Sequence, residues 1–169
     1  MVLYFSSCKQ VDEWTKYNMN FNSEVTISDT LLASDDSIFK LKADFFFDFG
    51  DELDSRAIKE KKIEKITFEE AVMETMEGTV QRDFSFMKDM ELSLEGVDFT
   101  NRVLGTRDSL RLNAIFTVFE MNEKDKMKEL LKADEFQLIL KFKVKRDLKV
   151  PIKIRFRTQF EVDVRQFFI

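Results

Sequence analysis

The sequence predicts an all-β protein, an antiparallel β-sandwich of about eight strands. Apolar and polar residues alternate along most of the chain, which is the period of strands that bury one face. The link at residues 146–149 is too short for a helical crossover, so the strands beside it are expected to run antiparallel. The 19 phenylalanines, in a chain that is 44% hydrophobic, suit a packed interior. An immunoglobulin-like or related sandwich with one short amphipathic helix before its last two strands fits this pattern.

Residues 135–164 show the alternation most clearly. Apolar residues occupy the even positions, and mostly charged or amide residues occupy the odd positions. If all even residues share one inner face, Val144 pairs with Ile152, and basic residues then lie opposite one another on the outer face. Like charges directly opposite are destabilising. The two strands therefore either diverge into two packed sheets, with Pro151 at the corner, or keep a basic face despite its cost.

Further strands are expected upstream, and two departures from the β pattern separate them. The strands are predicted at residues 17–27, 38–49, 63–73, 90–94, 97–104 and 110–118. The Glu-rich run at 68–76 also fits a helix, and a strand at 63–73 is preferred because the rest of the chain is built that way. Residues 105–108 predict a turn, and Phe116 and Val118 fall on the apolar face of the strand that follows. A cap at Asp54 or Ser55 predicts a short helical turn at 56–62. Helical spacing predicts an amphipathic helix at 122–133, with Asn122 as its cap.

Composition excludes several classes of function. The 169 residues fit one domain with a sizeable core, and the net charge of −5 argues against a general nucleic-acid binder. The chain has no histidine, which removes the commonest general base and the commonest transition-metal ligand. Its one cysteine cannot form an internal disulfide or a zinc cluster. The sequence therefore predicts no catalytic residues, no metal site and no cofactor.

The first residues predict a lipid anchor. Residues 1–7 form a short, mostly apolar segment, and Phe5-Ser6-Ser7 leads directly into Cys8. This order resembles the end of a bacterial lipoprotein signal peptide, in which an apolar run and two small residues precede the cysteine that is lipidated. The resemblance implies a signal-peptide remnant and lipidation site at 1–8, a polar tether at 9–16 and a single β-sandwich domain at 17–169. The alternative is an ordinary N-terminus with an incidental thiol.

The order of the predicted elements resembles the small β-sandwich lipoproteins of the Bacteroidetes type. The shared features are Phe5-Ser6-Ser7-Cys8, the helical turn before Ile63, the Phe84-Ser85-Phe86-Met87 segment ahead of residues 90–96, and the helix before the terminal strand pair. This resemblance implies a non-enzymatic binding or structural lipoprotein of the cell envelope, anchored to the outer membrane and either periplasmic or surface-exposed. Two alternatives stay open. One is a soluble cytoplasmic interaction or stress-protection protein, similar to the desiccation-associated β-sandwiches, and the other is a lipid carrier with a phenylalanine-lined cavity.

A basic stretch is the best candidate binding site in the sequence. Between residues 141 and 157 eight basic residues stand against one acidic residue, and six of the eight share one parity. An anionic glycan, a lipid headgroup or an acidic protein partner would suit such a face. The competing interpretation is that outward lysines only keep the sheet from pairing with other molecules. The six residues are Lys141, Lys143, Lys145, Lys153, Arg155 and Arg157.

An acidic stretch at residues 29–54 balances the basic one. Its eight carboxylates suggest calcium, but no EF-hand spacing is present, so solvated loops are the preferred interpretation. Asp44 and Asp48 share a strand face, and a carboxylate pair can hydrolyse glycosides at a suitable separation. Same-face carboxylates on a strand usually only face solvent, which is the interpretation taken here.

Overall fold

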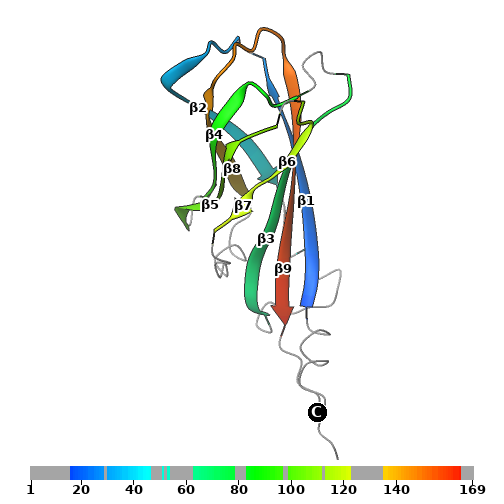
Figure 1. Cartoon of the computed structure of the whole chain (residues 1–169). Coiled ribbons are helices and arrows are strands. Elements are labelled where there is room, and N and C mark those ends of the chain that lie inside the picture. Colours follow the sequence, from blue (N-terminus) through cyan, green and yellow to red (C-terminus); the bar gives the residue numbers. More distant parts are fainter. Residues whose placement is uncertain are drawn as a thin grey trace, which may run out of the picture.

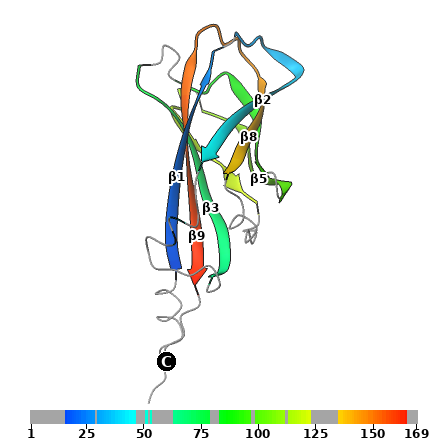
Figure 2. The same cartoon turned by 180° about the vertical axis from the view of Figure 1, so that it is seen from behind.

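The structure, a computed structural model, describes residues 16–28, 30–46, 51, 53, 63–78, 83–96, 99–111, 113–122 and 135–164. Within these residues nine strands form two antiparallel sheets that face one another (Figure 1, Figure 2). The prediction of an all-β sandwich is therefore confirmed. Cys8, residues 9–15 of the tether, the turn at 56–62 and the helix after Asn122 lie outside the described residues, whereas Lys16, the last residue of the predicted tether, already belongs to a strand. None of the described residues belongs to a helix with the length and hydropathy needed to cross a membrane.

Each sheet is named here after one of the two terminal strands. The β9 sheet has the order β1-β9-β3-β6, formed by β1 (Lys16–Ile27), β9 (Ile152–Val164), β3 (Ile63–Thr75) and β6 (Phe116–Val118). The β8 sheet has the order β2-β8-β4-β5-β7, formed by β2 (Ser34–Phe46), β8 (Glu135–Val144), β4 (Met87–Gly96), β5 (Phe99–Ser109) and β7 (Glu120–Met121).

The last two strands lie in different sheets. β8 pairs with β2 and β4, whereas β9 pairs with β1 and β3, so the pairing of Val144 with Ile152 does not form. The link between them is held at the corner, because Leu148 and Leu31 exchange two backbone hydrogen bonds of 2.8 and 3.0 Å. The Lys145 amide also donates to the Phe86 carbonyl at 2.8 Å. Of the two alternatives the sequence left open, divergence into two packed sheets is the correct one.

The structure corrects the prediction for residues 105–118. Residues 105–108 are part of β5 rather than a turn, and the chain turns later, around Asn113, whose φ is 63°. In β6 the core-facing residue is Thr117, which lies opposite the buried Met73. Phe116 and Val118 lie opposite Glu74 and Val72 on the outer face. Pairing with β3 sets this orientation, because directly opposite residues in a sheet point to the same side.

Aromatic rings fill the space between the sheets. Phe160 of β9 contacts Phe68 of β3 at 4.8 Å, Phe21 of β1 at 5.7 Å and Phe136 of β8 at 6.0 Å between ring centroids, all edge-to-face. Edge-to-face contacts are the preferred geometry because the positive ring edge meets the negative ring face. The contact with Phe136 crosses from one sheet to the other. The interior at this level is therefore closed by ring packing.

Candidate functional site

The structure divides the six basic residues between the two sheets. Lys141 and Lys143 lie on β8, and Lys145 follows directly after that strand. Lys153, Arg155 and Arg157 lie on β9. Because the outer faces of the two sheets point to opposite sides of the sandwich, the six residues do not form one basic face.

Carboxylates on β4 pair with two of the three lysines of the β8 group. Lys141 Nζ lies 2.7 Å from Glu91 Oε1, and Lys143 Nζ lies 3.4 Å from Asp89 Oδ2. Asp89 has a φ of 49° and lies where the pairing of β4 with β8 shifts by a bulge. A bulge re-aims the side chain of its extra residue. Lys145 is exposed and has no carboxylate partner among the described residues.

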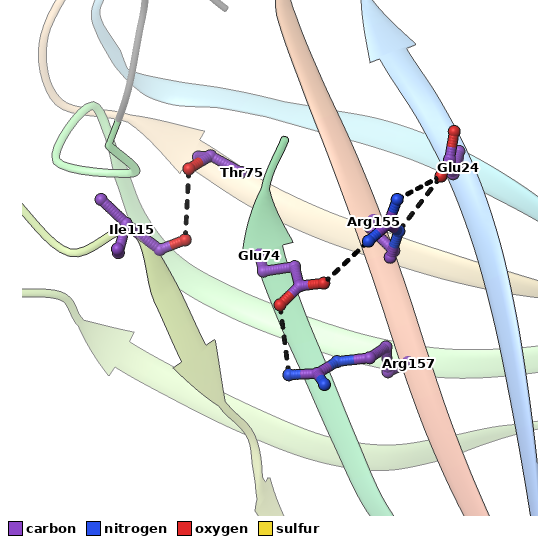
Figure 3. Close-up of polar contacts among 6 residues, drawn as sticks. All are labelled: Glu24, Glu74, Thr75, Ile115, Arg155 and Arg157. Atoms are coloured by element: carbon purple, nitrogen blue, oxygen red, sulfur yellow. Dashed lines mark hydrogen bonds and ion pairs between the residues drawn. The ribbon is translucent and has the colours of Figure 1, made fainter. Parts of the chain in front are cut away.

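Two of the three β9 residues, Arg155 and Arg157, form an ion-pair ladder across three strands (Figure 3). Lys153 is exposed and has no carboxylate partner among the described residues. Arg155 donates through Nε and Nη2 to Glu24 Oε1 on β1, at 3.1 and 2.8 Å, and its Nη1 lies 3.5 Å from Glu74 Oε1 on β3. Glu74 Oε2 accepts from Arg157 Nη2 at 3.1 Å. The hydrogen bond to Glu24 raises the pKa of Arg155. Two guanidinium groups thus meet two carboxylates, and the charge of the ladder is balanced.

Because the charge of the ladder is balanced, removing one of its carboxylates is expected to strengthen anion binding. We expect Glu74→Gln to elute from a heparin column at higher salt than the unmodified protein, because Arg157 loses its partner and Arg155 loses one of two. Glu120→Gln is the matched control, since it removes the same charge from a single ion pair with Arg107 in the other sheet. Equal shifts in the two variants would mean that only net charge matters.

A shallow pocket lies beside the ladder on the outer face of the β9 sheet. Its volume is about 300 Å³, and we call it the amide pocket. Two cross-strand rows form it: Asn20, Gln159 and Glu70 lie side by side, and Asn22, Arg157 and Val72 form the next row. Its lining consists of these six residues and Thr158.

Local backbone structure accounts for the hollow. The pairing of β3 with β9 shifts between Phe68 and Glu70, opposite Phe160 and Gln159. A bulge of this kind bends its strand and increases the local twist, which curves the sheet. Val72 in the next row carries only a short branched side chain, and Thr158 points inward, where its hydroxyl donates to the Phe21 carbonyl at 3.4 Å. The floor of the pocket is therefore made of small groups.

The polar groups around this pocket are open to a ligand. Asn20, Asn22 and Glu70 are exposed and Gln159 is half-buried. Among the described residues none of these four side chains has a hydrogen-bond partner within the chain. Arg157 differs, because Glu74 holds its guanidinium in place. The pocket thus combines free amide and carboxylate groups with one fixed guanidinium.

Three exposed apolar side chains flank the pocket at the β6 edge. Ile115, Phe116 and Val118 are 55%, 60% and 39% exposed, and we call them the apolar shelf. Phe116 lies opposite Glu74 of the ladder, and Val118 lies opposite Val72 of the pocket. The Ile115 carbonyl accepts from the Thr75 amide at 2.9 Å and from the Thr75 hydroxyl at 3.3 Å, which fixes the start of the shelf to β3 (Figure 3). Phe116 and Val118 of the shelf therefore share one outer face with the pocket.

The other candidate features show less organisation. Within the described part of the chain no three cysteine, aspartate or glutamate side chains gather as metal ligands. Asp44 is exposed, and its Oδ1 accepts from Gln137 Nε2 at 2.7 Å, while Asp48 lies outside the described residues. A second pocket of about 190 Å³ opens between the edge strands β1 and β2 and is lined partly by Phe39 and Phe142.

Two comparisons with known proteins were made at the level of sequence. No protein-family model matches the chain, and no curated protein matches it in sequence. The sequence singled out Lys153, Arg155 and Arg157 on this face as part of a basic site, but it did not predict the amide pocket beside them. The sequence signal for the pocket is the recurrence of asparagine at positions 18, 20 and 22, which places three amides on one strand face.

Proposed function

We propose that the protein is a non-enzymatic binding module of the cell envelope, anchored through a lipid on Cys8, that binds its ligand on the outer face of the β9 sheet. The observation that supports binding is the amide pocket, where unpaired polar groups surround a concave surface on a rigid sheet. Pockets with a few well-placed polar groups are typical of ligand sites. The support for the anchor is the Phe5-Ser6-Ser7-Cys8 sequence.

The charges of this face suit binding better than proton transfer. Glu24 and Glu74 are engaged with Arg155 and Arg157, and the chain has no histidine to serve as a general base. A catalytic carboxylate usually needs burial or a like-charged neighbour to tune its pKa. Glu70, the carboxylate in the pocket, is exposed and lies beside the guanidinium row. The arrangement therefore favours recognition of a ligand over its chemical conversion.

The ring packing of the interior argues for this proposal over a lipid carrier. A carrier needs a cavity large enough for acyl chains between its sheets. Phe160 instead bridges the sheets through Phe136, and Phe142 contacts Phe86 at 6.3 Å. The buried phenylalanines thus pack on one another at the levels where such a cavity would open.

Mass spectrometry of the protein from its native cells tests the anchor. We expect the mature N-terminus to be Cys8 carrying acyl chains, and the protein to sediment with membranes. Cys8→Ser should move it to the fraction that does not sediment, because one residue supplies the attachment point. Recovery of unmodified Cys8 with residues 1–7 still attached would contradict the anchor and favour the soluble alternative.

A further inference from the structure

We propose that the amide pocket and the apolar shelf together bind a neutral carbohydrate. The inference rests on the proposed function, because it names the ligand class of the same outer face. The supporting observation is that a polar pocket and an exposed apolar patch lie on the same face of the sheet. Free amides on β1 and β9 lie across β3 from an exposed phenylalanine on β6.

Planar polar groups in the pocket match the hydroxyls of a sugar. Each sugar hydroxyl is both a donor and an acceptor, and an amide side chain offers both functions from one rigid group. Asn20, Asn22 and Gln159 supply three such amides, and Glu70 supplies an acceptor. Arg157 adds donors already oriented by Glu74, so fewer side chains lose freedom when the ligand binds.

The apolar shelf provides the second half of the recognition. A pyranose ring carries C–H groups on its faces, and these pack on aromatic rings through dispersion and contact with the negative ring face. Phe116 exposes 60% of its surface on the same side of the sheet as the pocket. Val72 and Val118 lie side by side between the amides and the sheet edge. A ligand with one polar rim and one apolar face fits this arrangement.

Charge and size restrict the ligand further. The ion-pair ladder that borders the pocket is balanced, and Lys153, which has no carboxylate partner among the described residues, lies on the far side of the ladder from the pocket. An anionic ligand in the pocket would therefore meet a guanidinium that is already paired. The pocket alone covers three neighbouring strands, which span roughly 10 Å at the usual strand spacing, and the shelf lies at the fourth strand. A pocket of about 300 Å³ is at the small end of the range for ligand sites. One or two neutral sugar units, within a longer chain, match these limits.

Nuclear magnetic resonance titration tests this proposal on the folded protein. The probes are maltohexaose, cellohexaose and mannohexaose, each added to concentrations well above millimolar. We expect at least one of them to shift the side-chain amide signals of Asn20, Asn22 and Gln159 in a saturable way. Joint substitution of Asn20 and Asn22 by alanine should weaken that binding by about tenfold, the loss expected for two hydrogen bonds.

Matched controls separate recognition from general surface effects. Asn18→Ala removes an exposed amide from the same strand face but outside the pocket lining, and it should leave the affinity unchanged. Phe116→Ala should weaken binding by about threefold or more, and Phe116→Trp should preserve it, because the ring face is what contacts the sugar. Val103→Ala, an exposed apolar residue of the β8 sheet, should have no effect.

The outcome also distinguishes this inference from the broader proposal. If no oligosaccharide shifts the pocket signals, or if Asn18→Ala weakens binding as much as the double variant, the carbohydrate inference is overturned. Shifts produced by heparin and not by the neutral probes would overturn it in favour of an anionic ligand. The lipid on Cys8 is measured separately, so the anchored binding module can survive the loss of this ligand class.

Discussion

Phe160→Ala is expected to lower the free energy of unfolding by about 3–5 kcal/mol, which is the range for deleting a buried aromatic ring. Phe160 is 0% exposed and contacts rings from β1, β3 and β8. Its removal leaves a cavity where both sheets meet, and neighbouring rings cannot collapse into it without moving a sheet. Urea unfolding followed by circular dichroism would measure the change.

Phe116→Ala is the control for this prediction, because it deletes the same side chain from an exposed position. Its effect on unfolding is expected to be below about 1 kcal/mol, as for most surface substitutions. Comparable losses in the two variants would mean that Phe160 does not bridge the sheets as described. Such a result would also reopen the lipid carrier, since a loosely packed interior tolerates the loss of a ring.

Gly105→Ala is expected to destabilise the protein by about 1–3 kcal/mol, the usual cost of overpacking. A Cβ at this position would lie 2.6 Å from the Glu120 carbonyl oxygen and 3.3 Å from Met121 Sδ. The first neighbour is backbone, so β7 itself would have to move away from β5. Hydrogen exchange should therefore speed up at the Asn122 amide, which donates to the Leu104 carbonyl at 2.8 Å beside this contact.

Gly78→Ala separates crowding from backbone strain. Gly78 has a φ of 83°, and a Cβ there would meet nothing within 4 Å. Its substitution should cost about 1 kcal/mol through the left-handed backbone alone. The exchange rate at Asn122 should stay unchanged. Faster exchange at Asn122 in both variants would show that the effect comes from global loss of stability rather than from the β5–β7 contact.

Alternation along the strands predicted which side chains face the interior. In β8 and β9 the even residues are buried, including Leu140 and Ile154 at 0% exposure, as the sequence indicated. The same pattern could not identify neighbouring strands, because it specifies a face and not a partner. The like charges that an adjacent β8 and β9 would have placed together gave the useful hint that the two strands separate.

The alternation of apolar and polar residues gave wrong predictions for short elements. Phe116 and Val118 look like core residues because they are apolar and alternate, yet three residues of pairing with β3 turn them outward. Gly105 suggested a turn, although its role is to let β7 approach β5. In both cases the deciding contact comes from a distant part of the chain.

The amide pocket could not be predicted from the sequence because it also depends on pairing between distant strands. Asn20, Gln159 and Glu70 each occupy an ordinary outward position of an alternating strand, where polar residues are expected. Only the register of three strands brings them into one row, and only the bulge before Glu70 hollows the surface beneath them. The sequence alone identified Arg155 and Arg157 of β9, but not the carboxylates of β1 and β3 that pair with them.

The placement of β9 between β1 and β3 has a consequence for biosynthesis. Glu24 and Arg155, which meet across β1 and β9, are 131 positions apart, so β1 cannot complete its pairing with β9 until those 131 further residues have left the ribosome. Until β9 is made, β1 and β3 lack the strand that pairs with both of them. Their apolar faces then need protection from association with other nascent chains. A message truncated before codon 152 would yield a product that lacks the central strand of one sheet, and such a product should be degraded rather than accumulate.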